Sequence, residues 1–259
     1  MTTPAYLFTD DEERRIQAAE ELLDGGTIRV LAGLGLAPGW RCLEVGAGGG
    51  SIARWLAGRM NPSGEVVATD LNTQAFDSGA VPGLLARRHD IVRDPLEEDG
   101  FDLIHARLVL EHLPERDAVL VKLVRALRPG GWLVLEDADE VAATPVSSLG
   151  AADYERVTAV RLHEFTGRGF DGTFARRLPQ LLRAQGLVGV GNEGRLWIME
   201  GGSAGARWLL LSLRHLRSRL VGPGKLSEGE MERMLSLLED PAWAGFSPTI
   251  VSAWGQRPA

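Results

Sequence analysis

The stretch Leu43-Glu44-Val45-Gly46-Ala47-Gly48-Gly49-Gly50-Ser51 decides the fold. An apolar run over residues 41–45 leads into this glycine cluster, and apolar residues at helical spacing follow from Ile52 to Met60. A strand, a glycine turn and a helix together hold a polar ligand on backbone N–H groups at the helix N-terminus. Glycine suits the turn because it adopts positive φ and lets a ligand reach the backbone.

Two acidic residues indicate which ligand this turn holds. Glu44 lies at the mouth of the turn, and Asp70 ends the next apolar run, residues 66–70. The carboxyl ends of parallel strands meet at one edge of a sheet, so Asp70 should lie beside the glycine turn. A carboxylate placed there can accept hydrogen bonds from both hydroxyls of a ribose. We therefore expect a ligand that contains a nucleoside.

A nicotinamide dinucleotide is the first alternative, and the residues disfavour it. Its fingerprint, G-x-G-x-x-G, would need a glycine where this chain has Ser51. Glu44 would also repel a pyrophosphate. S-adenosylmethionine fits better, because it carries a sulfonium and an ammonium group and no phosphate.

Four segments, in order, resemble the motifs of class I S-adenosylmethionine-dependent methyltransferases. LEVGAGGGSIARWL resembles their first motif, VVATD their second, and FDLIHARLVLEHLPE and LRPGGWLVLED the later strands and turns. The nearest resemblance is to the quinone-biosynthesis-like branch, which includes many bacterial small-molecule and natural-product methyltransferases of secondary metabolism. It implies a Rossmann-like α/β fold, with a seven-stranded, mostly parallel sheet whose last strand is antiparallel. The cofactor is then S-adenosylmethionine and the product S-adenosylhomocysteine.

The resemblance also implies a set of cofactor contacts. Glu44 would bind the ammonium, Asp70 the ribose and Asp90 the adenine amino group, while Leu71 would pack on the ring. Arg107 could pair with the cofactor carboxylate, and Tyr6 could fold over the cofactor. The alternatives are a loop cap for Asp90, a surface charge for Arg107 and an aromatic residue of the N-terminal tail for Tyr6. The full set is Tyr6, Glu44, Gly46, Ala47, Gly48, Gly50, Asp70, Leu71, Asp90, Ile91, Ala106 and Arg107.

Methyl transfer needs no dedicated acid or base, because the cofactor already activates the methyl group. His163, His215 and His112 are the candidate catalytic bases, since imidazole titrates near neutral pH, although each is individually more typical of a structural or solvated histidine. Phe165 and Trp208 are candidate walls of the acceptor pocket. We expect no metal, because no histidine, cysteine or carboxylate cluster has ligand spacing.

Composition limits the partners. The chain has 259 residues, a net charge of -7 and one cysteine, Cys42. The acidic balance disfavours nucleic acid, and the single cysteine suits the cytoplasm. We find no signal peptide and no apolar run long enough to span a membrane. The expected partner is a small-molecule acceptor, and the expected state is a monomer or homodimer.

The order of elements predicts one methyltransferase domain with a helical cap. Residues 1–37 would form a flap of two helices, about 11–23 and 27–35, that are separated by Asp24-Gly25-Gly26. Residues 38–139 would bind the cofactor, 140–245 would supply the remaining core and cap helices, and 246–259 the terminal strand. A protein that binds the cofactor without transferring methyl is the alternative function, and turnover to S-adenosylhomocysteine distinguishes the two.

Overall fold

The structure is a computed structural model that describes residues 10–74, 76 and 81–259. The chain forms two compact units. The first combines the described residues up to Leu23 with Glu140–Arg168 and Leu196–Thr249. The second combines Asp24–Asp139, Gly169–Arg195 and Ile250–Ala259. The predicted boundaries after residues 37, 139 and 245 stay predictions.

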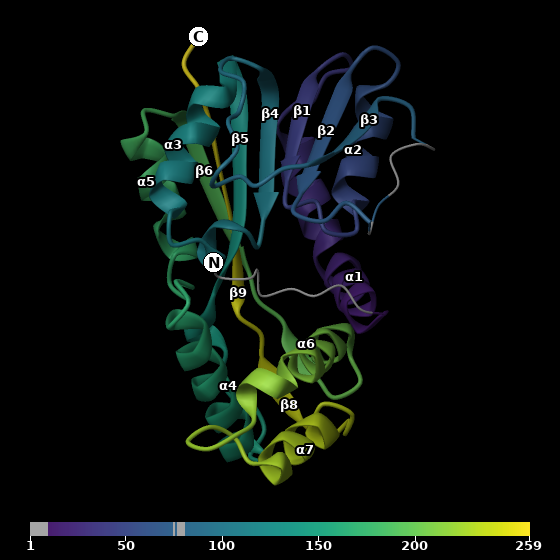
Figure 1. Cartoon of the computed structure of the whole chain (residues 1–259), viewed down its shortest axis with the longest axis vertical. Coiled ribbons are helices and arrows are strands. Elements are labelled where there is room, and N and C mark those ends of the chain that lie inside the picture. Colours follow the sequence, from purple (N-terminus) through teal and green to yellow (C-terminus); the bar gives the residue numbers. More distant parts are fainter. Residues whose placement is uncertain (1–9, 75, 77–80) are drawn as a thin grey trace. The chain divides into compact units, whose positions relative to one another are not determined.

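A seven-stranded sheet forms the core of the second unit, with strand order β3-β2-β1-β4-β5-β9-β6 (Figure 1). The pairs β1–β2, β2–β3, β1–β4 and β4–β5 are parallel, and β9 pairs with β6 in antiparallel orientation. The predicted Rossmann-like sheet is therefore confirmed. The strands are β1 (Arg41–Val45), β2 (Glu65–Asp70), β3 (Leu84–Arg88), β4 (Phe101–Arg107), β5 (Leu127–Asp139), β6 (Val188–Arg195) and β9 (Thr249–Gln256).

Alternate residues of the central strands supply two separate apolar layers. Cys42 of β1 packs in one cluster with Leu56 of α2 (Ser51–Met60), whereas its neighbour Leu43 packs in another with Leu120 of α3 (Arg116–Ala126). This is the period-two pattern of a strand that is buried on both faces. Helix α5 (Leu178–Ala184) and the 3-10 turns η1 (Leu110–His112) and η3 (Ala175–Arg177) complete the unit.

Cys42 is fully buried in β1. Burial raises the pKa of its thiol to about 12, and the charges of Asp102 and Glu44 add to this shift. The thiol is therefore protonated and unreactive at neutral pH. This agrees with its expected role as a small apolar residue.

The first helix differs from the prediction. Instead of two helices there is one, α1 (Asp10–Gly33), which continues through Gly25 and Gly26. A side chain on Gly26 would meet Arg195, because its Cβ would lie 2.5 Å from Nε. Glycine within a helix costs roughly 1 kcal/mol relative to alanine. We infer that close packing of Arg195, rather than a helix end, is the reason for this glycine.

The first unit is mostly helical. Helices α4 (Ala151–Thr166), α6 (Ala204–Leu220) and α7 (Glu228–Leu237) share an apolar cluster around the buried Trp243. Ser227 and Glu230 form a reciprocal capping box at the start of α7, which fixes where this helix begins. A two-stranded antiparallel sheet of β7 (Ile198–Glu200) and β8 (Ala244–Phe246) and the turn η2 (Glu140–Ala142) complete it. Within the described residues, no helix is long and apolar enough to cross a membrane.

Three segments differ from what their sequence patterns predict. The Pro-Gly-Gly run in residues 128–131 predicts a turn but lies inside the long strand β5, and residues 174–185, whose pattern predicts one helix, begin with a 3-10 turn. Residues 187–200, whose pattern predicts one strand or a hairpin, divide between β6 in the large sheet and β7 in the small one. A helix or turn is also predicted over residues 72–79, and that segment lies largely outside the described residues.

Candidate functional site

The turn between β1 and α2 is built from glycines with positive φ. Gly46, Gly48 and Gly50 have φ of 67°, 57° and 81°. A Cβ on Gly46 would lie 2.5 Å from Cγ2 of Val109, and one on Gly50 would lie 2.9 Å from Cβ of Phe76. Conformation and space therefore both require glycine at these two positions. Val109 and Phe76 thus pack directly on this turn, and three left-handed glycines at alternate positions shape the link from β1 to α2.

Asp70 contacts this turn from the end of β2. Its Oδ2 accepts a hydrogen bond from the N–H of Gly48 at 3.0 Å, and its Oδ1 accepts one from Asn72 at 3.1 Å. Ala47 adds a second link, because its N–H donates to the carbonyl of Thr69 at 2.9 Å. The predicted closeness of Asp70 and the glycine turn is therefore present in the structure. Each carboxylate oxygen can accept more than one hydrogen bond, so these contacts leave the group suited to bind hydroxyls.

Glu44, at the mouth of the turn, is 4% exposed and pairs with a histidine. Its Oε2 lies 2.7 Å from Nδ1 of His105, the residue aligned with it on β4. The other ring nitrogen, Nε2, lies 3.2 Å from Oε2 of Glu136 on β5. One imidazole thus bridges two buried carboxylates across three neighbouring strands.

This bridge determines the charge of the histidine. Burial alone would lower the pKa of His105, but the charge of Glu44 and hydrogen bonds with Glu136 and Glu44 raise it to about 9. At neutral pH the ring is therefore a cation whose two N–H groups each donate a hydrogen bond to a carboxylate. As a result the Glu44 carboxylate is held in a fixed orientation.

Glu136 is the centre of the same network. The hydroxyl of Thr27 on α1 donates to its Oε2 at 2.5 Å, and Nη2 of Arg195 on β6 donates to Oε1 at 2.6 Å. Ser252 on β9 also donates to Oε1. Burial opposes ionisation, yet these donors and His105 lower the pKa of Glu136 below its ordinary value. Two cationic side chains, His105 and Arg195, and two hydroxyl groups thus compensate the buried charge of Glu136.

Arg107 ends β4 and binds α1. Its Nη2 donates to Oδ1 of Asp24 at 2.8 Å, and its Nη1 donates to the hydroxyl of Thr27 at 2.8 Å. Its side chain is mostly buried rather than a solvated surface charge. That Arg107 pairs with the cofactor carboxylate stays a prediction. Such a pair would add to the contacts with Asp24 and Thr27 or replace them.

The remaining predicted contacts lie on neighbouring loops of the second unit. Asp90 caps its own loop, because Oδ1 accepts hydrogen bonds from Val92 at 2.9 Å and from Arg93 at 3.3 Å. Leu71, directly after Asp70, is 46% exposed, which is unusual for a leucine beside a core strand. Ile91 and Ala106 are buried. Tyr6 lies outside the described residues.

His112 lies in the turn η1 and packs on Phe170, with ring centroids 5.2 Å apart. Its Nε2 is 3.2 Å from Oε1 of the buried Glu111. Glu111 also accepts a hydrogen bond from the backbone of Ala138, at 2.6 Å. Burial and the charge of Glu111 raise the pKa of Asp137 well above its ordinary value. These contacts anchor the turn to β5.

The other predicted acceptor residues belong to the first unit. His163 is exposed on α4, and Phe165 packs against the apolar cluster. His215 on α6 lies 3.3 Å from the carboxylate of Glu12 on α1. Trp208 is half-buried on α6, and its Nε1 is enclosed without a hydrogen-bond partner. An enclosed N–H without a hydrogen-bond partner is unfavourable. A ligand that places a hydrogen-bond acceptor beside Nε1 would therefore bind more tightly.

His105, Thr27, Arg195 and Ser252 are not among the site residues that the sequence predicts; His105, within an apolar strand, is typical of a structural histidine. The signal for His105 was present, because Glu44, His105 and Glu136 are titratable residues within otherwise apolar strands. The other three come from distant segments, and only the folded sheet brings them to Glu136. Among the described residues, no group of three or more histidine, cysteine or carboxylate side chains is arranged to hold a metal ion.

Residues 43–133 match the model of a methyltransferase domain. A methyltransferase of Strobilurus tenacellus, Str2, is 33% identical over 140 residues, 53% of this chain and 50% of that protein. The ubiquinone/menaquinone biosynthesis C-methyltransferase of Laribacter hongkongensis is 28% identical, over 49% of this chain and 57% of its own. The chain thus spans about half the length of the curated relatives that it matches.

Solved structures share the fold across nearly the whole chain. Phosphoethanolamine N-methyltransferase 2 of Haemonchus contortus, in complex with phosphomonomethylethanolamine and S-adenosylhomocysteine, has a TM-score of 0.59 at 16% identity. The match covers 95% of this chain and 58% of that one. YcgJ of Bacillus subtilis has a TM-score of 0.58 at 12% identity, with coverage of 91% and 99%.

Proposed function

We propose that the protein is a class I S-adenosylmethionine-dependent methyltransferase that methylates a small metabolite, because residues 43–133 match a methyltransferase-domain model and about half of the chain is similar to curated methyltransferases. The acceptor would be a planar or apolar molecule that reacts through oxygen, nitrogen or carbon. One observation carries the proposal: the Asp70 carboxylate lies against the glycine turn, 3.0 Å from the N–H of Gly48. This is a hydroxyl-binding group at the edge where open α/β sheets bind ligands.

The residues at this edge fit S-adenosylmethionine. Gly46, Gly48 and Gly50 have positive φ, and Gly46 and Gly50 have no room for a side chain, so the turn needs glycine at these two positions. The carboxylates of Glu44 and Asp70 flank it and favour a ligand with cationic and hydroxyl groups. A pyrophosphate would be repelled by the same two carboxylates. The charge pattern therefore supports a sulfonium nucleoside over a dinucleotide.

Each side chain would have a definite task. Asp70 would accept the ribose hydroxyls and Glu44 the ammonium group, while Leu71, Asp90 and Ile91 would enclose the adenine. Gly46, Ala47, Gly48, Gly50 and Ala106 would line the methionine part with backbone, and Arg107 would pair with its carboxylate. His105 would position Glu44, because its hydrogen bond to Oε2 fixes the orientation of the carboxylate. The second oxygen, Oε1, would then be the one that meets the ammonium group.

The cofactor supplies a methyl group on a sulfonium, which is ready for direct displacement by a nucleophile. The tasks left to this chain are to orient the two reactants and to exclude water from them. A base would be needed only for an acceptor that must lose a proton. His112, His163 and His215 remain the candidates, and Phe165 and Trp208 remain candidate acceptor walls.

Thermal unfolding with ligands tests this proposal. S-adenosylmethionine and S-adenosylhomocysteine should each raise the Tm, because a ligand that binds only the folded state stabilises it by mass action. NAD should leave the Tm unchanged. Stabilisation by NAD, and by neither adenosyl compound, would contradict the cofactor assignment.

Transfer itself needs a second measurement. A panel of phenols, amines and quinols should contain at least one compound that accelerates formation of S-adenosylhomocysteine, with a matching gain of one methyl in the compound's mass. Tight cofactor binding without turnover on a broad panel would instead favour the protein that binds the cofactor without transferring methyl.

A further inference from the structure

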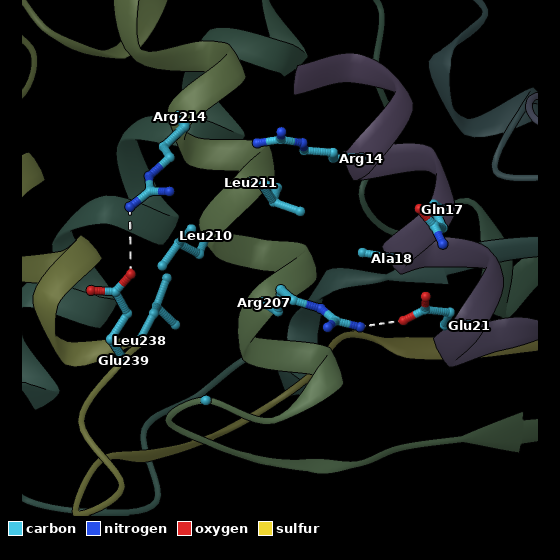
Figure 2. Close-up of a pocket in the computed structure, with 11 residues that line it drawn as sticks. Arg14, Gln17, Ala18, Glu21, Arg207, Leu210, Leu211, Arg214, Leu238 and Glu239 are labelled. Carbon is cyan, nitrogen blue, oxygen red and sulfur yellow. Dashed lines mark hydrogen bonds and ion pairs between the residues drawn. The ribbon is translucent and has the colours of Figure 1, made fainter. Parts of the chain in front are cut away.

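A second, separate cavity lies entirely within the first unit. It encloses about 500 Å³ between α1, α6 and the end of α7, and Figure 2 shows its lining. This volume is within the range of small-molecule sites. None of the residues predicted to bind cofactor or acceptor lines it.

The cavity follows from matched spacing on two helices. Arg14, Gln17, Ala18 and Glu21 recur at i, i+3, i+4 and i+7 on α1, and Arg207, Leu210, Leu211 and Arg214 recur in the same way on α6. Residues at this spacing share one face of a helix. Two contacts join the helices α1 and α6: Glu21 with Arg207 on these faces, and Glu12 with His215 at 3.3 Å outside them. The cavity opens where the small side chain of Ala18 leaves room between the helices.

The lining has an apolar base. Leu210, Leu238 and Ala18 are buried, and all three contribute to the wall. Water over an apolar base is poorly held, so displacing it with an apolar group is favourable. The base therefore favours a ligand with a hydrophobic body over a simple inorganic ion.

The rim carries an excess of positive charge. Arg207 is paired with Glu21, whereas Nη2 of Arg214 is 3.4 Å from Oε1 of Glu239, longer than a good charge-assisted hydrogen bond. Among the side chains that the structure describes, which on α1 begin at Glu12, no carboxylate lies within ion-pair distance of Arg14, and Figure 2 shows the Arg14 side chain extending from α1 toward α6. Three arginines and two glutamates leave one net positive charge, in a chain whose net charge is -7. This is the charge that a monoanion would balance.

We propose that this cavity binds a small organic carboxylate with an apolar body. The carboxylate would be held by Arg14 and Arg214, whose guanidinium groups match its geometry, and the body would cover Leu210 and Leu238. A dianionic phosphate fits less well, because a second charge would have to displace Glu21 from Arg207. The site belongs to the first unit and does not depend on the proposed methyl transfer.

Calorimetry of the full-length chain with 2-naphthoate tests the site, and the uncharged 2-naphthamide is the matched probe. The carboxylate should bind, and the amide should bind at least about fivefold more weakly. Added salt should weaken binding of the carboxylate, because it screens the attraction between the charges. Equal binding of the two probes, or none of the carboxylate, would overturn the proposal.

Three substitutions locate the binding. R14Q should weaken it roughly fivefold or more, and E21Q should strengthen it, because it releases Arg207 from its partner. R168Q removes an exposed arginine of the same unit outside the cavity and should change nothing. A gain in E21Q cannot arise from unfolding. Equal losses in R14Q and R168Q would show a general charge effect and reject the site.

Whether the bound carboxylate reacts is read from the same samples. Incubation with S-adenosylmethionine should leave the mass of the bound carboxylate unchanged, because the cavity shares no residue with the predicted cofactor and acceptor set. A gain of one methyl that is lost in R14Q would overturn the separation of the two sites. The affinity of R14Q for S-adenosylhomocysteine should equal that of the unaltered protein, so failure of the cofactor assignment would be visible separately.

Discussion

His105 and Glu44 face each other on neighbouring parallel strands, with 2.7 Å between Nδ1 and Oε2. The second ring nitrogen contacts Glu136 at 3.2 Å, so the cation is enclosed by two carboxylates. Breaking such a buried arrangement by removing one partner leaves an uncompensated charge, which is strongly destabilising. The network therefore stabilises the fold and orients the group that would meet the cofactor's ammonium.

The first prediction concerns pH. The pKa of His105 is about 9 in the folded chain and about 6.5 in the unfolded one. Protonated His105 therefore adds on the order of 3 kcal/mol to the free energy of unfolding. This contribution is fully present below pH 6.5 and is lost as the pH rises through 9. Urea unfolding at pH 6.5, 8 and 9.5 measures it. H105Q should lose this dependence and H163Q, at an exposed site, should keep it; an unchanged slope in H105Q would refute the assignment.

The second prediction concerns Asp70. D70A should weaken binding of S-adenosylmethionine by roughly 1.5–3 kcal/mol, the scale of hydrogen bonds to a charged group. The fold should persist, because the residue is only half-buried at the end of β2. Isothermal titration calorimetry gives the affinity, and D117A, which removes an exposed carboxylate from α3, is the control. Equal affinities of D70A and the unaltered protein would remove Asp70 from the site.

The third prediction concerns the glycine turn. G46A should lower the free energy of unfolding and the cofactor affinity together, because its Cβ would lie 2.5 Å from Cγ2 of Val109. Adding V109A should recover part of the loss by removing that methyl, while the strain of positive φ remains. G58A, in open space within α2, should instead stabilise by roughly 0.5–1 kcal/mol. If G46A behaves like G58A, the turn is not the close-packed cradle described.

The fourth prediction concerns the acceptor and rests on the proposed methyl transfer. W208F removes an indole N–H that has no protein partner, and H215Q removes a possible base. Both should change the KM or kcat for the acceptor and leave the Kd for S-adenosylhomocysteine nearly unchanged. A dedicated base would appear as a kcat loss of ~10²–10⁴ in H215Q, H163Q or H112Q. Proportional losses of cofactor affinity would argue against an acceptor role.

Local signals predicted the start of the second unit. The glycine turn and the apolar runs on either side of it each act over a few residues, so β1, α2 and β2 could be placed from sequence. The break in α1 at Gly25-Gly26 was wrong because a glycine can end a helix or give room to a distant side chain, here Arg195. Which of the two applies depends on tertiary contacts that local pattern does not contain.

The site was predicted unevenly for the same reason. The place of Asp70 follows from parallel topology, which fixes where neighbouring strands end. The hydrogen bonds of Thr27 and Ser252 to Glu136 join residues more than a hundred positions apart, and no local spacing indicates them. The register of β1 with β4 aligns Glu44 with His105, and a shift by one residue would separate them.

The single thiol makes the opening of β1 directly observable. Cys42 is enclosed within β1, three residues before the last residue of that strand, Val45, and it is protonated at neutral pH. A thiol reagent can modify it only when the sheet opens, so the labelling rate in native buffer reports the free energy of that opening. No introduced label is needed, because the chain has no other cysteine. Ligands that bind at the end of β1 can thus be detected, without any enzymatic assay, by how far they slow the modification of one sulfur atom.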